Sequence, residues 1–329
     1  MDRSSQLRNS QKDQLIIGLA QMAPVWLDRK FTREKMISFI EQAAARECKL
    51  VVFGEALLPG YPFWIERTDG ARFNSAVQKE MHALYMDQAV QIEAGHLETL
   101  CRVAEQSKLA VYLGCIERAY DRGGHSLYCS LVFIDADGQI RSVHRKLMPT
   151  YEERLTWAIG DGHGLCVHPL PPFTVGGLNC WENWMPLARS ALYGLGEDLH
   201  VAVWPGGAHN TADITRFIAK ESRSYVLSAS GLMKDSDFPK ATPHRDKILA
   251  STHGFLANGG SCVAGPDGEW VIEPVLEKEE LIVAVLDHHR VRQERQNFDP
   301  VGHYSRPDVL HLSLNRKRQS TLTVVDSGP

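Results

Sequence analysis

The stretch FTVGGLNCWENWMPLARSALYGLG, residues 173–196, joins a strand pattern to a helix pattern through a cysteine. Residues 173–180 predict a buried β-strand, and apolar side chains recur at helical spacing over 186–195. The Gly-Gly pair in the strand allows close backbone approach, and Cys180 is expected in the turn where the strand ends. A cysteine in such a strand-to-helix turn faces the positive end of the helix dipole, which favours the thiolate. The pattern therefore predicts an α/β fold with a cysteine nucleophile at a strand end.

The rest of the chain alternates in the same way between short β-rich runs and longer helical patterns. Further strand patterns lie at 15–22, 49–55, 109–117, 128–138, 200–205, 226–231, 259–268 and 281–287, and helical patterns at 36–44, 97–104 and 213–225. No Pro/Gly/Ser-rich linker divides the chain, so we predict one α/β domain over 15–310, with layered sheets and outer helices. It lies between a polar N-terminal segment, 1–14, and a polar tail, 311–329, which is expected to be a solvated end.

The composition limits the kinds of partner. Of 329 residues, 36 are Lys or Arg and 40 are Asp or Glu, which gives a net charge of −4. This charge offers no electrostatic reason to expect nucleic acid or an anionic membrane as a partner. The longest apolar runs are strand-sized, so neither a signal peptide nor a membrane-spanning helix is expected. A small neutral molecule is the partner that these features favour.

The seven cysteines are scattered, odd in number, and without the spacing of a zinc site or a disulfide framework. Thiols that stay reduced indicate a cytoplasmic location, and no metal is expected. Apart from Cys180, the cysteines lie among apolar neighbours, where a free cysteine usually packs as a small hydrophobic residue; these are Cys48, Cys101, Cys115, Cys129, Cys166 and Cys262. None of the 14 histidines stands at a spacing that selects it as a partner for the Cys180 thiol.

Two other strand ends carry candidate catalytic side chains. Glu55 follows the apolar run KLVVFG, and a carboxyl group that is partly desolvated there has a raised pKa, which suits a general base. Lys146 follows IRSVHR, and an ammonium beside a reacting centre stabilises a developing anion. Simpler interpretations stay open for both: an exposed glutamate at a strand end, and a solvated basic edge made of His144, Arg145 and Lys146.

These residues lie in three motifs that together resemble the nitrilase (carbon-nitrogen hydrolase) superfamily, whose site is a Glu-Lys-Cys triad. The motifs are EALLPGYP with Glu55, HRKLMPT with Lys146 and NCWEN with Cys180, in the family's chain order. The Trp-Glu pair after the cysteine resembles the true nitrilase branch, because amidases and carbamoylases usually carry Tyr-Asp there. ERLTWAIGDG, HVAVWP and DPVGHYSRPDVL extend the resemblance across almost the whole chain. Gly54 departs from it, since many relatives carry proline before the glutamate.

The resemblance also implies supporting residues. Glu153, seven residues after Lys146, matches the family's second glutamate, which helps hold the lysine in place. By the same comparison Tyr61, Thr150, Trp157 and Trp181 are expected to line the substrate pocket. A helix-surface ion pair for Glu153 and core packing for the aromatic residues are the alternatives. The irregular segments 60–75 and 234–247 are candidates for loops that border the site.

The fold and function that the resemblance implies are an α-β-β-α sandwich and the hydrolysis of an organic nitrile. The nitrile and water would give a carboxylic acid and ammonia through a thioester on Cys180, with no cofactor. Family members pair through outer helices, and nitrilases often extend the dimer into spirals or filaments, so a homo-oligomer is expected. A cyanide-hydrolysing enzyme, an amidase and an inert scaffold protein of the same fold are the other hypotheses.

Overall fold

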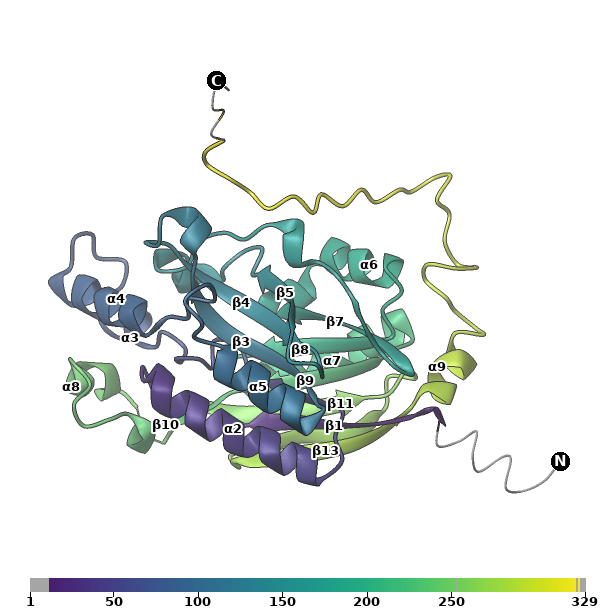
Figure 1. The fold of residues 1–329 in the computed structure, drawn as a ribbon, viewed down its shortest axis with the longest axis horizontal. Helices are drawn as coiled ribbons and strands as arrows, with labels where there is room; N and C mark the ends of the chain where they lie inside the picture. The colour runs from purple at the N-terminus through teal and green to yellow at the C-terminus, as the bar shows by residue number, and fades with distance from the viewer. Residues whose placement is uncertain (1–11, 253, 324, 326–329) are drawn as a thin grey trace.

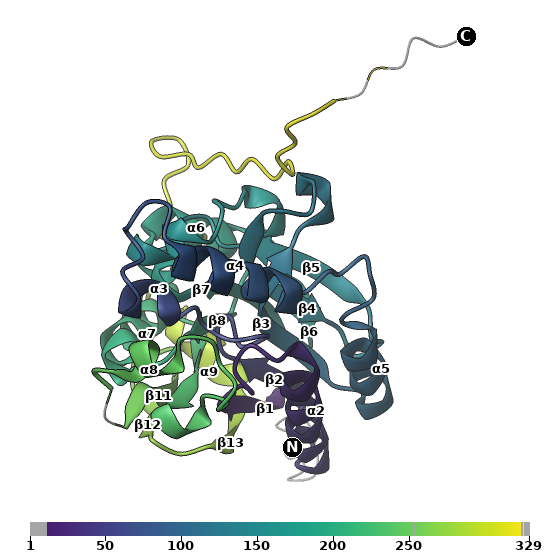
Figure 2. The same cartoon turned by 90° about the vertical axis from the view of Figure 1, so that its left-hand side faces the viewer.

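The structure is a computed structural model that describes residues 12–252, 254–323 and 325. Most of the expected N-terminal segment 1–14, and residues 324 and 326–329 of the expected tail, therefore lie outside the described residues. Two β-sheets pack face to face. Figure 2 shows α2 (Arg29–Ala45) and α5 (Glu98–Ser107) on one side of them and α6 (Pro186–Gly194) and α7 (Ala208–Ser222) on the other. Within the described residues, no helix has both the length and the apolar character needed to cross a membrane.

The strands of the first sheet follow the order β13-β1-β2-β3-β4-β5. β1, β2 and β3 are parallel, whereas β13, β4 and β5 each pair antiparallel with a neighbour. The two reversals at β4 and β5 make β5 run in the same direction as β2, so the carboxyl ends of both strands lie at one edge. The bounds are β1 Gln14–Gln21, β2 Leu50–Phe53, β3 Ala110–Arg118, β4 Leu127–Ile134, β5 Ile140–Arg145 and β13 Glu280–Asp287.

The second sheet follows the order β10-β11-β9-β8-β7-β6, and β12 also pairs with β11. Here β7, β8 and β9 are parallel, and the outer strands are antiparallel to their neighbours. Each sheet thus has a parallel centre flanked by antiparallel strands. The bounds are β6 His168–Leu170, β7 Phe173–Asn179, β8 Leu199–Trp204, β9 Tyr225–Ser230, β10 Leu232–Lys234, β11 Phe255–Ala264 and β12 Trp270–Leu276.

Helices α2, α5, α6 and α7 form the outer layers (Figure 1). Buried residues of α2 and α5 pack on the first sheet, and those of α7 pack on the second. α7 begins at Ala208, five residues before the predicted start, because Gly206 and Gly207 complete the turn after β8 with positive φ angles. The bounds are α2 Arg29–Ala45, α3 Trp64–Arg67, α4 Ala76–Gln88, α5 Glu98–Ser107, α6 Pro186–Gly194, α7 Ala208–Ser222, α8 Arg245–Leu249 and α9 His288–Glu294.

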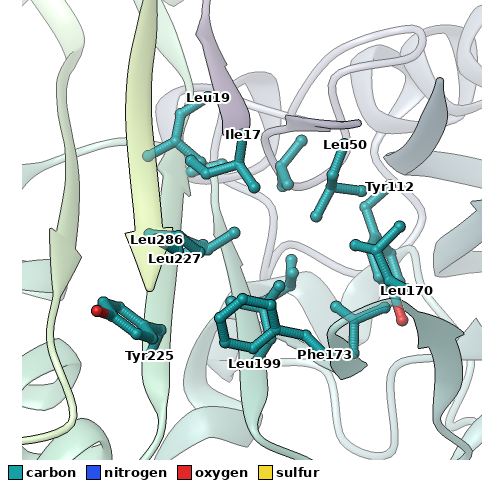
Figure 3. Packing of buried hydrophobic residues seen from close by; sticks show 14 of the residues in the cluster. Ile17, Leu19, Leu50, Tyr112, Leu170, Phe173, Leu199, Tyr225, Leu227 and Leu286 are labelled. Atoms are coloured by element: carbon teal, nitrogen blue, oxygen red, sulfur yellow. The ribbon is translucent and has the colours of Figure 1, made fainter. Parts of the chain in front are cut away.

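The main hydrophobic core lies between the two sheets. In β2, Leu50 and Val52 face this core, whereas Val51 and Phe53 pack in the layer of α2 and α5, as the two-residue period of a strand requires. Figure 3 shows side chains from both sheets in the inter-sheet core, among them Ile17, Leu19, Leu50, Tyr112, Phe173, Leu199 and Leu227. The layers are helix, sheet, sheet and helix, which confirms the expected α-β-β-α sandwich.

The two segments expected to be irregular contain short helices and meet each other. Segment 60–75 includes α3, and segment 234–247 includes the start of α8. Their aromatic rings pack together, with the ring centroids of Phe63 and Phe238 6.2 Å apart. α3 forms because Trp64 and Ile65 bury their side chains in a cluster with Phe238 and Ile248. Figure 1 places α3, α4 and α8 together at one end of the sandwich.

Residues 314–319 of the expected C-terminal tail contact the body of the protein, although most of them are exposed, as expected for a solvated end. Leu314 packs in a cluster with Leu165 and Leu178. Arg318 donates to Asp161 Oδ1 at 2.9 Å and to the carbonyl of Val143 at 3.1 Å. The basic cluster in the tail therefore pairs with an acidic side chain of the domain, which a scan of composition does not reveal.

Candidate active site

The three candidate catalytic residues follow strands whose carboxyl ends meet at one edge of the sandwich. Glu55 comes two residues after β2, Lys146 directly after β5 and Cys180 directly after β7. At this edge the backbone N–H of Glu55 donates to the carbonyl of Trp204, at the end of β8, at 3.1 Å. A Cβ atom on Gly54 would lie 3.0 Å from that same carbonyl oxygen, so the glycine allows the close approach of the two sheets.

The Lys146 ammonium lies between two carboxylates. Its Nζ atom is 2.8 Å from Glu55 Oε1 and 2.7 Å from Glu153 Oε2. Side-chain atoms of both glutamates and the sulfur of Cys180 lie within 4.8 Å of one another. Two carboxylates and a thiol are also metal-ligand types, but here the ammonium supplies the positive charge between them. The structure thus brings together all four predicted side chains, while their catalytic roles stay predictions.

Burial decides between the interpretations that the sequence left open. Each of His144, Arg145 and Lys146 is no more than 3% exposed, so the alternative of a solvated basic edge is wrong. Arg145 is satisfied by Glu117, with the two side chains 2.6 Å apart. Glu55 is 3% exposed, which excludes an exposed glutamate at the strand end. Ionisable groups are buried to this extent only when they are paired or hydrogen-bonded.

Glu153 is held from three sides. Its Oε2 atom accepts the backbone N–H of Thr150 at 2.6 Å, and its Oε1 atom accepts the hydroxyl of Tyr61 at 3.0 Å. Thr150 and Glu153 form a capping box at the start of the 3₁₀ helix Tyr151–Leu155. Glu153 is 2% exposed, so the alternative of a surface ion pair is wrong. These contacts leave the carboxylate one orientation, toward Lys146.

The predicted pocket residues divide into two groups. Trp157 is buried with its ring centroid 5.4 Å from Lys146 Nζ, and the ring of Tyr61 meets it edge-on at 5.7 Å. Thr150 contributes its backbone N–H to Glu153, as above. The side chain of Trp181 is 53% exposed, so it is not part of the buried cluster. Its backbone, however, hydrogen-bonds Cys180.

The buried cluster shifts the pKa values of its members. Burial raises the pKa of Glu55 to about 7, although the Lys146 ammonium opposes the shift. Burial and the nearby Glu55 carboxylate raise the pKa of the Cys180 thiol well above its ordinary value. The backbone of Trp181 in the turn and the Lys146 ammonium oppose this rise, as the sequence predicted for the turn, but burial and the carboxylates outweigh them. A short 3₁₀ turn, Cys180–Trp184, follows the cysteine instead of a long helix, and two carboxylates face the sulfur. Cys180 needs a base to remove its proton.

Three residues of the site have left-handed backbone conformations. Cys180 has φ 47°, Ala56 after Glu55 has φ 53°, and Tyr151 after Thr150 has φ 41°. A left-handed conformation costs a non-glycine residue about 1–2 kcal/mol, and such strain concentrates at functional sites. At Cys180, the Asn183 side-chain amide donates to the strained residue's carbonyl at 2.8 Å, and His200 Nε2 lies 2.7 Å from Asn183 Oδ1.

Two polar residues of the site were missed by the sequence interpretation. Cys129, expected to be a packing residue, places its sulfur 3.5 Å from Glu55 Oε1. Glu182 is buried and accepts hydrogen bonds from the backbone of Asn179 and from His144. The Asn-x-x-Glu spacing of residues 179–182 is a capping-box signal that could have identified Glu182. For Cys129 the chain offered no local signal.

Comparisons with known proteins agree with this geometry. Residues 16–296 match the family described as carbon-nitrogen hydrolase. The chain is 33% identical to an aliphatic nitrilase of Rhodococcus rhodochrous (94% of this chain, 85% of that protein) and 34% identical to Nitrilase 2 of Arabidopsis thaliana (93% and 90%). The crystal structure of a carbon-nitrogen hydrolase from Helicobacter pylori G27 has the same fold, with a TM-score of 0.64 and 21% identity over 90% of this chain and 96% of that one. By sequence and by fold, this chain belongs to the carbon-nitrogen hydrolase family.

Proposed function

We propose that this protein is a nitrilase that converts an organic nitrile and water to a carboxylic acid and ammonia. The observation that carries the proposal is the buried cluster in which Lys146 contacts Glu55 and Glu153, with the Cys180 sulfur beside them. The curated relatives named as nitrilases support the choice of substrate class. We place the catalytic unit at residues 15–310, as one domain that uses no cofactor or metal.

In the first half of the reaction, Glu55 removes the Cys180 proton as the sulfur attacks the nitrile carbon. A Glu55 pKa of about 7 suits this exchange, because the carboxylate is partly ionised at neutral pH and is basic enough to take the proton. The nitrile nitrogen gains a proton, which gives a thioimidate on Cys180. Lys146 and the backbone N–H of Trp181 stabilise the developing negative charge, and a preorganised donor of this kind contributes about 3 kcal/mol.

In the second half, Glu55 activates water. Water adds to the thioimidate carbon and forms a tetrahedral intermediate that carries sulfur, nitrogen and oxygen. Breaking the carbon-nitrogen bond releases ammonia and leaves a thioester, and a second water then releases the acid and restores the Cys180 thiol. Glu153 keeps the Lys146 ammonium in position through the contacts described above. If the intermediate loses sulfur instead of nitrogen, the product is an amide.

We further propose a cytoplasmic location and self-association, first as a dimer and then as a larger spiral or filament. All seven cysteines, which lie in the described part of the chain, are free, and this supports a reducing compartment. Large apolar side chains are exposed on and beside the outer helices α6 and α7, including Leu187 (68%) and Phe217 (52%). Such side chains on outer helices are typical of protein interfaces. We propose no nucleic-acid or membrane partner.

The test is a substrate panel with purified protein. Aliphatic, aromatic and arylacetonitriles, cyanide and simple amides are supplied separately, and ammonia, acid and amide are measured. We expect organic nitriles to release ammonia fastest, Cys180→Ala to abolish the reaction, and Cys262→Ala, which removes a buried thiol elsewhere, to keep it. Faster hydrolysis of cyanide or amides would reassign the substrate, and absence of any hydrolysis would favour a scaffold protein. Activity that survives in Cys180→Ala would overturn the mechanism.

A further inference from the structure

Glu182 is a buried carboxylate that the proposed reaction does not use. It is 1% exposed and lies in the 3₁₀ turn that begins at Cys180. Its Oε2 atom accepts the backbone N–H of Asn179 at 2.8 Å, and its Oε1 atom accepts the backbone N–H of Leu147. Both oxygens lie 3.1 Å from His144 Nε2. The carboxylate is therefore held by hydrogen bonds from two backbone groups and one side chain.

The two backbone donors flank the two catalytic groups. Asn179 directly precedes Cys180, and Leu147 directly follows Lys146. Asn179 ends β7 in the second sheet, whereas Leu147 follows β5 in the first sheet, so no strand pairing fixes their separation. A single carboxylate thus bridges the two sheets at the point where sulfur and ammonium must meet.

We infer that Glu182 is a positioning residue that fixes the Lys146 ammonium relative to the Cys180 sulfur, so that the tetrahedral intermediate loses ammonia and not sulfur. The inference rests on the proposed nitrilase function. The choice of product depends on placement, because loss of ammonia requires a proton donor near the nitrogen while the carbon-sulfur bond stays intact. When the donor is displaced, the electron pair of the carbon-sulfur bond leaves with sulfur, and the intermediate collapses to the amide and the Cys180 thiolate.

The ionised form of Glu182 is what its surroundings select. Burial alone would raise its pKa, but His144 and the two backbone donors hold that pKa below its usual value. Glutamine in this position keeps the shape and removes the charge. One of its two terminal atoms is an amide nitrogen, which must face the N–H of Asn179 or of Leu147 in either orientation. One of the two backbone hydrogen bonds is then lost, and two donors face each other in its place.

The experiment compares Glu182→Gln with Glu117→Gln. Glu117 is also a buried carboxylate, paired with Arg145 and Ser130, but these contacts stay within the first sheet. For Glu182→Gln we expect kcat to fall about 10- to 100-fold, KM to change less than about threefold, and the amide fraction of the product to rise at least about fivefold. For Glu117→Gln we expect thermal stability to fall while the amide fraction keeps the wild-type value.

A second pair of variants covers the case in which Glu182→Gln does not fold. His144→Leu removes the side-chain donor to Glu182, whereas His144→Gln keeps an N–H donor near the same position. We expect His144→Leu to raise the amide fraction and His144→Gln to restore it toward wild type. The inference is overturned if Glu182→Gln and Glu117→Gln change the amide fraction equally, or if neither His144→Leu nor Glu182→Gln changes it.

One measurement separates this inference from the proposed function, since it needs no nitrile. The rate of alkylation of Cys180 by iodoacetamide is followed against pH by mass spectrometry of the peptide that contains Cys180. The Lys146 ammonium lowers the pKa of the Cys180 thiol, so its displacement in Glu182→Gln should move the alkylation midpoint to higher pH. An unchanged midpoint in Glu182→Gln would overturn the positioning role even where the nitrilase assignment holds. A shifted midpoint supports it even where the substrate proves different.

Discussion

The thiol of Cys129 donates to Oε1 of Glu55 at 3.5 Å, and this is the same oxygen that accepts the Lys146 ammonium. Cys129 lies on β4, and its backbone carbonyl also accepts the N–H of Lys146 at 2.7 Å. The other oxygen of Glu55 has no hydrogen-bond partner among the described residues. Glu55 thus presents one oxygen held by two donors and one oxygen open to accept a proton, as a general base requires.

The first prediction concerns the thiol of Cys129. A donor to the ionised carboxylate lowers the Glu55 pKa, so Cys129→Ala should raise that pKa and move the acidic limb of the kcat/KM profile to higher pH. Cys129→Ser keeps a donor and should leave the limb within about 0.3 pH units of wild type or move it to lower pH. The profiles are measured between pH 5 and 9. If the acidic limb of the kcat/KM profile lies at the same pH in Cys129→Ala and in wild type, the thiol only fills space.

The second prediction concerns Glu55 itself. Because its pKa is raised to about 7, wild-type kcat/KM should rise with pH through about 7 as the base ionises. Glu55→Gln should lower kcat about 10²- to 10⁴-fold at pH 8, the range for loss of a general base. Glu279→Gln, at a partly exposed glutamate paired with Lys35, is the matched control and should keep the wild-type rate.

The raised pKa of Glu55 also makes the free energy of unfolding depend on pH. Folded Glu55 holds its proton up to about pH 7, whereas an unfolded glutamate loses it near 4.5. Its contribution to the free energy of unfolding is therefore full below about pH 4.5 and falls as pH rises through about 7. The Tm of wild type minus that of Glu55→Gln should be more positive at pH 5 than at pH 8. A difference that is constant across this range contradicts the raised pKa.

Much of the site follows from strand ends that are visible in the sequence. Glu55 and Cys180 each follow an apolar strand pattern, and Lys146 follows the mixed run IRSVHR. Strands that run in the same direction bring such ends to one edge. Cys129 could not be found in this way, because its place beside Glu55 depends on the register of β4 against β3 and β5, where Ser130 pairs with Arg145. Register is a property of the folded sheet and leaves no local pattern in the chain.

The net shift of the Cys180 pKa could not be predicted from the sequence for a related reason. A strand-to-helix turn predicts a positive field at the cysteine, but the pKa depends on every charge that the fold gathers there. Glu55 and Glu153 come from segments 125 and 27 residues away in the chain, and burial removes the water that would weaken their effect. The position of Cys180 after a strand could be predicted from the sequence. The charges around its sulfur become visible only in the folded structure.

The third prediction concerns Tyr61. Its hydroxyl donates to Glu153 at 3.0 Å, and its ring meets Trp157 edge-on. Tyr61→Phe keeps the ring and removes a hydrogen bond to a charged group, which is worth about 1.5–3 kcal/mol. We expect kcat to fall roughly tenfold and KM to stay near wild type. Tyr193→Phe, which removes a similar bond to Glu221 away from the site, should lower Tm and leave kcat unchanged. Equal kcat losses in the two variants would contradict a role for Tyr61 at the site.

The fourth prediction concerns the C-terminal tail. Arg318 pairs with Asp161, which is 5% exposed, and Gly160 beside it donates to the carbonyl of Lys146 at 2.9 Å. Arg318→Ala leaves Asp161 without its side-chain partner, which should lower the free energy of unfolding by about 1–3 kcal/mol. Burial alone would raise the Asp161 pKa, but the backbone N–H groups of Gln319 and His163, together with Arg318, hold it below its ordinary value. The loss should therefore be full near pH 7 and shrink as pH falls below about 4. Urea unfolding at pH 7 and pH 3.5 measures it. Lys317→Ala, at an exposed neighbour, should leave the free energy of unfolding unchanged at both pH values. A loss in Lys317→Ala equal to that in Arg318→Ala would show that the tail acts only through its net charge.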